Sequence, residues 1–209
     1  MKRAIPWILA AIAVLGFAVT FFELHREHSR QRHHRALFRE FVIRSELAGA
    51  KAPILIMGDS ITEGATFPQE IAGRPLVNGG ISGATVEDFE RIAPLLVAAK
   101  PSFVVIALGT NNTAEGLRAS YAALLGRLKA LFPNILAVGV TPQTDAESKN
   151  AVIKAAADRE GIHFFTVPMP AGSTRLDGVH LNDAGYQAYT PALVAEISDW
   201  IGKRQPKIR

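Results

Sequence analysis

Residue types that can perform chemistry follow several apolar runs of the sequence. Gly58-Asp59-Ser60 comes directly after the apolar run 54–57, where glycine permits a tight turn and a helix can begin. A serine at the start of a helix lies near the positive end of the helix dipole and near free backbone N–H groups. Both features stabilise the oxyanion of acyl transfer, so Ser60 is a candidate nucleophile. In isolation, the tripeptide is also a common turn, and serine is a common N-cap.

A base for this nucleophile is present near the C-terminus. Asp177 precedes His180 by three residues, so its carboxylate can fold back onto the imidazole within one turn. That contact selects one tautomer and leaves the other ring nitrogen facing a serine. Residues 51–209 contain one other histidine, His163, which lies in a predicted buried strand and is expected to be a core residue. We therefore predict a catalytic triad of Ser60, His180 and Asp177.

Two further loops carry groups that stabilise an oxyanion. The segment 78–85 (NGGISGAT) contains three glycines, which let the backbone approach a substrate and turn its N–H groups inward. The segment 109–112 (GTNN) supplies asparagine side chains, whose NH₂ groups can donate to a developing negative charge. Each segment alone is equally consistent with an ordinary turn.

Apolar runs alternate with helical patterns from residue 51 onward. The runs lack polar alternation, as expected of parallel strands covered on both faces. Such alternation predicts a doubly wound α/β sheet of about five parallel strands, with chemistry at their carboxyl ends. The predicted strands are 54–57, 76–78, 103–108, 135–140 and 163–167. The predicted helices are 86–99, 114–132, 145–160 and 182–201; the first is expected to break near Pro94, and the last to be bent or interrupted at Pro191.

Four motifs in this order resemble the SGNH hydrolases, or GDSL-type esterase/lipase superfamily, over nearly all of residues 51–202. The motifs are GDSIT (58–62), NGGISG (78–83), GTNN (109–112) and DGVH (177–180). The resemblance implies a three-layer, flavodoxin-like α/β/α sandwich, the same triad, and no metal or other cofactor. It also implies an oxyanion hole formed by the backbone N–H groups of Ser60 and Gly83 and by the side chain of Asn111. The sequence departs from the family pattern at Asn112, where aspartate is more common.

The N-terminal segment 4–22 is apolar and uncharged, and it follows Lys2 and Arg3. Its length nearly matches the hydrocarbon core of a bilayer. A cleaved signal peptide is the alternative, but no convincing cleavage site follows the run. We predict a membrane anchor at 1–22, a basic juxtamembrane helix at 23–50 and a hydrolase domain at 51–209. Export of that domain to the periplasmic or extracellular side is favoured, although the basic residues after the run argue for the cytoplasm.

The positive charge of the chain lies at its two ends. Residues 1–50 carry eight basic and four acidic side chains, whereas residues 51–202 carry eleven basic and fifteen acidic ones. A nucleic-acid-binding face would need basic residues clustered on the domain itself, so we expect no nucleic-acid partner. Histidines 25, 28, 33 and 34 lie in the basic helix, but no carboxylate or cysteine completes a metal-ligand set, so a solvated face is favoured.

The motifs leave the substrate open. The family hydrolyses acetylated sugars, simple esters, thioesters and lysophospholipids, so fold analogy does not choose among them. Short segments between the motifs leave little material for a lid, which favours a short acyl group such as acetyl on envelope carbohydrate. A lysophospholipase or thioesterase acting on lipids and an acyltransferase using the same triad are the alternatives. A flavodoxin-like binding module is disfavoured, because Asp59 and Glu63 would repel a phosphate.

Overall fold

The computed structural model describes the backbone of residues 5–204 and the side chains of residues 14–96 and 98–203. The chain divides into two compact units, Met1–Arg39 and Glu40–Arg209. Helix α1 (Ile5–Gly49) is continuous between them. Its last turns belong to the second unit, where Ile43 and Leu47 are buried. The packed domain therefore begins before residue 51, where the sequence analysis places its start.

The first unit consists of the N-terminal part of α1. Large apolar side chains are exposed along it, among them Val14, Phe17 and Phe21. Over the part of the chain whose side chains are described, no helix is long and apolar enough to span a membrane. Of the predicted anchor 4–22, Ala4 lies outside the described residues, and so do the side chains of residues 5–13. The anchor therefore stays a prediction from the sequence.

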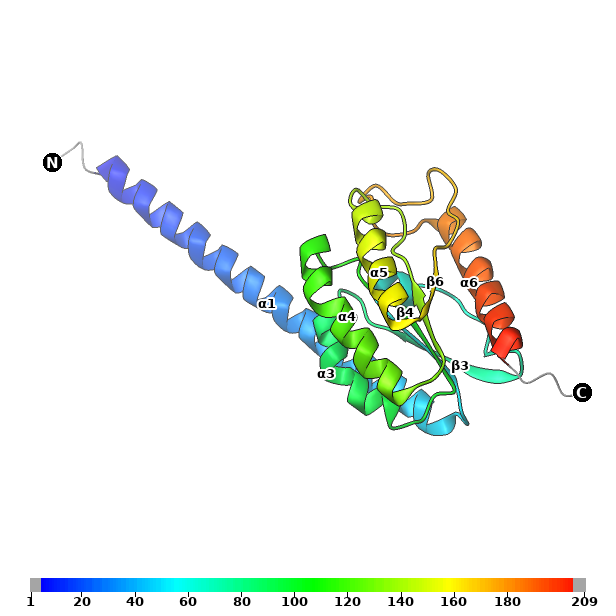
Figure 1. Ribbon diagram of the computed structural model, residues 1–209. Helices are drawn as coiled ribbons and strands as arrows, with labels where there is room; N and C mark the ends of the chain where they lie inside the picture. Colours follow the sequence, from blue (N-terminus) through cyan, green and yellow to red (C-terminus); the bar gives the residue numbers. More distant parts are fainter. Residues whose placement is uncertain (1–4, 205–209) are drawn as a thin grey trace, which may run out of the picture. The chain divides into compact units, whose positions relative to one another are not determined.

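The second unit is built on a six-stranded sheet with the order β2-β3-β1-β4-β5-β6 (Figure 1). All five predicted strands are present and parallel, and their order is that of a flavodoxin-like doubly wound sheet. The sixth strand, β2, was not predicted; it is a two-residue edge strand that pairs antiparallel with β3 through a tight turn. The strands are β1 (Ile54–Gly58), β2 (Glu70–Ile71), β3 (Arg74–Gly80), β4 (Phe103–Ala107), β5 (Ile135–Val138) and β6 (His163–Phe165).

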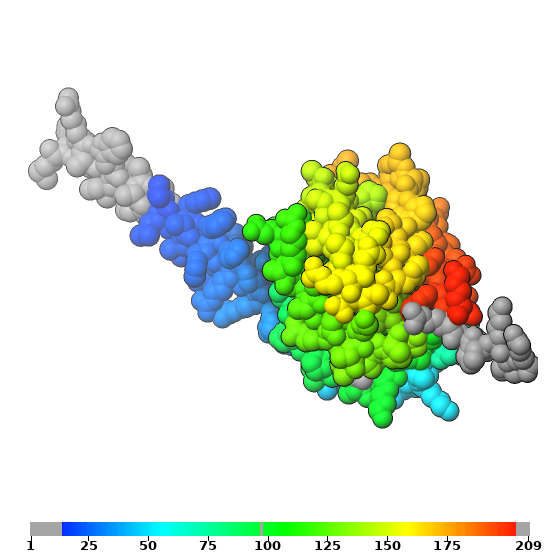
Figure 2. All heavy atoms as spheres, in the orientation of Figure 1, coloured from blue at the N-terminus to red at the C-terminus, as the bar shows by residue number. Residues whose placement is uncertain are grey.

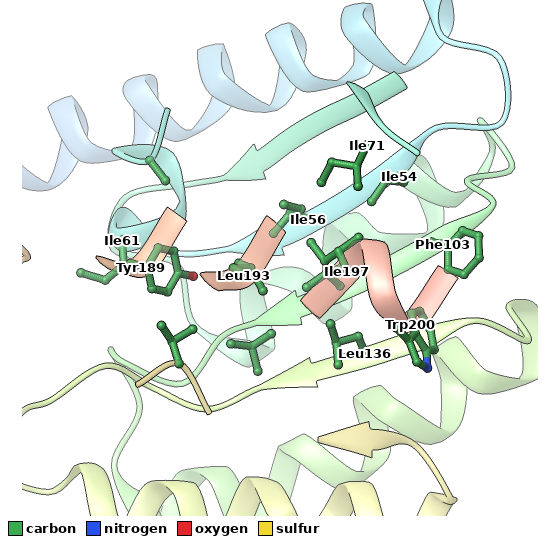
Figure 3. Close-up of a cluster of buried hydrophobic side chains, with 14 of the residues drawn as sticks. Ile54, Ile56, Ile61, Ile71, Phe103, Leu136, Tyr189, Leu193, Ile197 and Trp200 are labelled. Atoms are coloured by element: carbon green, nitrogen blue, oxygen red, sulfur yellow. The ribbon is translucent and has the colours of Figure 1, made fainter. Parts of the chain in front are cut away.

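Helices cover both faces of the sheet, as the uninterrupted apolar strands require. On one face α6 packs Leu193, Ile197 and Trp200 against Ile54 and Ile56 of the sheet (Figure 3). The alternate strand residues are equally buried on the other face, where α4 and α5 lie against each other and form a continuous surface (Figure 2). The helices after α1 are α2 (Ser60–Glu63), α3 (Val86–Val97), α4 (Ala114–Leu131), α5 (Ala146–Glu160) and α6 (Asp183–Arg204). The prediction that the helices are interrupted at Pro94 and Pro191 is wrong, because α3 and α6 continue through these prolines.

One expectation about the sheet is wrong. His163 was predicted to be a buried core residue, but its side chain is 42% exposed and its Nε2 lies 2.6 Å from Oε1 of Glu196. The physical reason is that β6 is the last strand of the sheet, so one side of it has no neighbouring strand. An apolar run alone does not distinguish an edge strand from a central one.

Candidate active site

Ser60 lies at the carboxyl end of the central strand β1, where the chain passes directly into α2. Asp59 is the N-cap of this short helix, and its Oδ1 accepts a hydrogen bond from the N–H of Ile61 at 3.0 Å. As the first residue of the helix, Ser60 has a backbone N–H that points away from any helical partner. The hydroxyl and the N–H of Ser60 are therefore presented together at the edge of the sheet.

Asp177 and His180 lie in a tight hairpin that precedes α6. Thr174 and Leu181 form an isolated antiparallel bridge, and the N–H of Arg175 donates to the carbonyl of His180 at 2.7 Å. The side chain of Asn182 then donates to the carbonyls of Gly172 and Thr174, which ties the hairpin to the start of α6. These contacts hold the base of the hairpin, and its exposed tip carries Asp177.

The structure brings Ser60, His180 and Asp177 together in one series of hydrogen bonds. His180 Nε2 lies 3.0 Å from Ser60 Oγ, and His180 Nδ1 lies 2.8 Å from Asp177 Oδ2. The second carboxylate oxygen of Asp177 accepts from the N–H groups of Val179 and His180, each at 2.9 Å. The side chains of His180 and Asp177 are 45% and 49% exposed, so the arrangement is open to solvent.

These contacts keep Asp177 ionised. The hydrogen bond from the N–H of Val179, followed by those from the side chain and the N–H of His180, lowers the pKa of Asp177 from 3.8 to about 2. A carboxylate that stays charged accepts from Nδ1–H and leaves Nε2 of His180 able to accept the serine proton. The three side chains have the geometry of a serine nucleophile, its base and the group that orients the base.

The loop after β3 places Gly83 in a type II turn. The N–H of Ala84 donates to the carbonyl of Ile81 at 3.0 Å, and Gly83 has φ +77°, the left-handed value that this turn requires at its third residue. The carboxylate of Glu63 accepts from the N–H of Ser82 in the same turn. By contrast, the N–H of Gly80 already donates to Asn78 Oδ1, which agrees with the choice of Gly83 as the donor in this segment.

Asn111 follows β4 and is held beside the same turn. Its Nδ2 donates to the carbonyl of Ala84 at 3.0 Å, which links the two candidate oxyanion loops directly. An amide NH₂ has two hydrogens, so this bond leaves the second hydrogen for another acceptor. The predicted donors Gly83 and Asn111 are therefore coupled to each other through one residue, Ala84.

Asn112, where the family pattern has aspartate, is buried and connects this loop to the start of α3. Its Oδ1 accepts from the N–H of Val86 at 3.1 Å, and its Nδ2 donates to Glu87 Oε2 at 2.9 Å. Partial burial raises the pKa of Glu87, but hydrogen bonds from Ser120, its own N–H, Asn112 and the N-cap Thr85 lower it overall. An aspartate at position 112 would place a second carboxylate against that of Glu87. The asparagine avoids this repulsion because its NH₂ group donates to Glu87.

Two charged groups beneath the loops were not predicted from the sequence. Glu63 holds Ser82, as described above, and Lys149 of α5 donates to the carbonyl of Thr110 at 2.8 Å. Glu63 lies one turn after Ser60, which is a signal that could have been used. Lys149 lies in the first turn of α5, 39 residues from Thr110, and no local pattern distinguishes it from a surface lysine.

Asp59 is buried near Thr110. Burial raises the pKa of its carboxyl group, and the hydroxyl and N–H of Thr110 and the N–H of Ile61 partly offset this effect. Thr110 approaches the carboxyl group without giving Oδ2 a hydrogen bond of regular geometry. The carboxyl group of Asp59 therefore connects the start of α2 with the loop after β4.

A serine, a histidine and an aspartate in hydrogen-bonding series at the carboxyl edge of a doubly wound sheet define the site of a serine hydrolase. The family model described as GDSL-like Lipase/Acylhydrolase matches residues 56–188. The chain belongs to this GDSL-like lipase/acylhydrolase family, which confirms the SGNH resemblance, and it is a hydrolase acting on ester bonds. No curated protein matches the chain in sequence.

Similar solved structures agree on the fold. An acetylxylan esterase from Geobacillus stearothermophilus has 21% identity and a TM-score of 0.60, covering 72% of this chain and 96% of its own. A Streptococcus pneumonia protein proposed to be a platelet activating factor has 19% identity and a TM-score of 0.65, covering 87% and 99%. An α/β hydrolase enzyme from the metagenome of Lake Arreo, Spain, has 19% identity and a TM-score of 0.56, covering 70% and 94%.

Proposed function

We propose that this esterase cleaves carboxylic esters through an acyl-enzyme on Ser60, with His180 as general base and Asp177 as the group that orients it. The observation that carries the proposal is the unbroken series of hydrogen bonds from Asp177 through His180 to Ser60, at 2.8 and 3.0 Å. In apo hydrolases such bonds are often longer, so a formed series supports a site that is ready before substrate arrives.

In this mechanism His180 Nε2 takes the proton of Ser60 as Oγ attacks the ester carbonyl. The N–H groups of Ser60 and Gly83 and the side chain of Asn111 donate to the resulting oxyanion. His180 returns its proton to the departing alcohol, which leaves the acyl group on Oγ. Water then attacks this ester with the same base, which releases the acid and restores the serine.

The acyl group that we propose is short, with acetyl on envelope carbohydrate as the favoured substrate. Two features support this choice. About half of the surface of the His180 and Asp177 side chains is exposed, so a bulky polymer can approach the site. The loops that carry the proposed oxyanion donors are only a few residues long, which leaves them little material to enclose a long acyl chain. One of the solved structures with this fold is an acetylxylan esterase, which supports an acetylated carbohydrate as the substrate class.

The test is hydrolysis of p-nitrophenyl esters from acetate to palmitate by the full chain, with Ser60→Ala as the control. We expect a preference for acetate and a loss of at least about 10⁴-fold in kcat for the variant, with an unchanged melting temperature. A preference for long chains would indicate a lysophospholipase or thioesterase instead. Acyl transfer to an added sugar in competition with water would indicate a transferase, and a fully active Ser60→Ala variant would refute the mechanism.

Anchoring of the chain by residues 4–22 and export of the catalytic domain are also proposed. They rest on the apolar, uncharged sequence of that segment and on the exposed apolar side chains along its described part. Carbonate extraction of membranes from cells expressing the full chain tests the anchor. A protein released into the soluble fraction at its full length would contradict it, and one released after loss of this segment would indicate a cleaved signal peptide.

A further inference from the structure

Lys149 is a charged side chain in a buried position. Only 4% of its surface is exposed, although it lies on α5, which covers one face of the sheet. Its Nζ donates to the carbonyl oxygen of Thr110 at 2.8 Å and lies 3.1 Å from Oδ1 of Asp145, the N-cap residue of the same helix. The Asp145 side chain is 47% exposed, so solvent screens this ion pair and the bond to Thr110 is the buried contact.

Burial of an ammonium group is unfavourable unless its hydrogen bonds are satisfied, and an apolar side chain of similar volume is often as stable or more so. Stability alone therefore does not explain a lysine at this position. What distinguishes the lysine is its partner. The carbonyl of Thr110 belongs to the peptide bond that joins Thr110 to Asn111, and Asn111 carries the amide proposed as an oxyanion donor.

A shift of the Thr110 backbone would move the Asn111 donor. A misplacement of about 1 Å at a reacting group can reduce a rate by about 100-fold.

We propose that Lys149 is a positioning residue for the esterase reaction: its ammonium group holds the Thr110 carbonyl so that Asn111 is oriented toward the oxyanion. This inference rests on the proposed function of the site. Lys149 acts through Thr110 and does not itself touch the substrate. Its effect is expected in the transition state, where the oxyanion exists, and not in substrate binding.

The experiment is a double-mutant cycle of Lys149→Met and Asn111→Ala in the full chain, with p-nitrophenyl acetate as substrate. Lys149→Met is expected to lower kcat about tenfold and to leave KM within about twofold, because transition-state stabilisation alone is lost. Asn111→Ala is expected to lower kcat by about 10²-fold or more. If Lys149 acts through Asn111, the double variant has nearly the activity of Asn111→Ala alone.

Lys154→Met is the matched control, because Lys154 lies on the same helix but pairs at the surface with Asp158. It is expected to keep wild-type kcat. Lys149→Gln is the second variant, since its amide can still donate to the Thr110 carbonyl without a charge. It is expected to recover part of the lost rate, and it replaces Lys149→Met in the cycle if that protein does not fold.

The outcomes separate this inference from the proposed function. Full activity in Ser60→Ala would refute the proposed function. If Ser60→Ala is inactive but Lys149→Met keeps wild-type kcat, the positioning role is wrong and the triad stands. If the effects of Lys149→Met and Asn111→Ala multiply, Lys149 has only a structural role, and the inference is again wrong.

Discussion

The hairpin 174–181 and the pair of loops 81–84 and 109–112 serve the same reaction but are held in different ways. In the hairpin the Asp177 carboxylate accepts hydrogen bonds from Val179 and His180, which lie two and three residues along the chain. In the loops the contacts join residues far apart in sequence. Asn111 bonds to Ala84, Asn112 to Val86, and Lys149 to Thr110, over separations of 27, 26 and 39 residues.

The difference extends to solvent. The acid–base side chains of the hairpin are about half exposed, whereas Asn112 and Lys149, which support the loops, are buried. An exposed carboxylate gains its orientation from local backbone N–H groups and needs no packed environment. Donors for an oxyanion must be fixed before the charge develops, and a buried network provides that rigidity. Damage to the hairpin is therefore expected to affect activity alone, and damage to the loop supports is expected to affect stability as well.

Among substitutions in the hairpin and the two loops, the largest effect is expected from Asp177→Asn. An amide at this position keeps one oxygen for the N–H groups of Val179 and His180, but it presents an NH₂ group to His180 Nδ1 and so favours the wrong tautomer. We expect kcat to fall by about 10³- to 10⁴-fold with little change in melting temperature. Measurement of kcat and thermal unfolding of the purified variant tests both parts.

The pH dependence sharpens this prediction. The pKa of Asp177 falls from 3.8 to about 2 in the folded protein, so the stabilisation from its ionised form is complete above pH 3.8 and is lost only as the pH falls through about 2. Asp177 is therefore ionised at every pH of a normal assay. An NMR titration of the Asp177 carboxyl carbon should therefore have its midpoint near pH 2, and a midpoint at or above 3.8 would contradict the hydrogen bonds assigned to this carboxylate.

A smaller effect on activity is expected from Gly83→Ala, for which the chain offers a matched control. Gly73, in the turn between β2 and β3, has φ +71°, close to the +77° of Gly83, and a methyl group at either position would meet no atom within 4 Å. Both substitutions should lower the free energy of unfolding by about 1–2 kcal/mol through the cost of a positive φ. Thermal or denaturant unfolding measures this shared effect.

Activity should distinguish the two glycine variants. An alanine at position 83 can relieve its strain by flipping the peptide between Ser82 and Gly83, which turns the proposed donor N–H away from the oxyanion. We expect kcat to fall by about 10- to 100-fold for Gly83→Ala and to remain unchanged for Gly73→Ala. Equal kcat values for the two variants would remove the Gly83 N–H from the oxyanion hole.

The smallest effect on activity is expected from Asn112→Asp, which restores the more common residue of the family. The new carboxylate would still accept from the N–H of Val86 but would repel Glu87, at a cost of about 1–3 kcal/mol in the free energy of unfolding. Like charges raise the pKa values of both carboxyl groups in the folded variant. The loss of stability should therefore be small below about pH 4 and grow as the pH rises.

Glu87→Gln provides the rescue for this variant, because an amide at position 87 can donate to the new carboxylate. The double variant Asn112→Asp/Glu87→Gln should regain most of the lost stability when both are compared by urea unfolding at pH 7. If the double variant is as unstable as Asn112→Asp, repulsion between the two carboxylates is not the cause.

Much of the fold could be predicted because its signals are local. Parallel strands buried on both faces appear as uninterrupted apolar runs, and all five were found in the sequence. The positions of α3 to α6 follow from helical patterns within each segment, but the interruptions predicted at Pro94 and Pro191 are absent from α3 and α6. The antiparallel strand β2 and the exposed position of His163 were missed, because strand pairing and sheet edges depend on the order of strands in space.

The sequence by itself determined the residue types at the ends of the strands and the three-residue spacing of Asp177 and His180, since short-range geometry follows from the chain. Tertiary structure alone decided that Ser60 lies 3.0 Å from His180, which is 120 residues away. It also decided that Glu87 suits Asn112, and that Lys149 reaches Thr110. These contacts join segments that only the packing of helices on the sheet brings together, and no local pattern in the sequence encodes them.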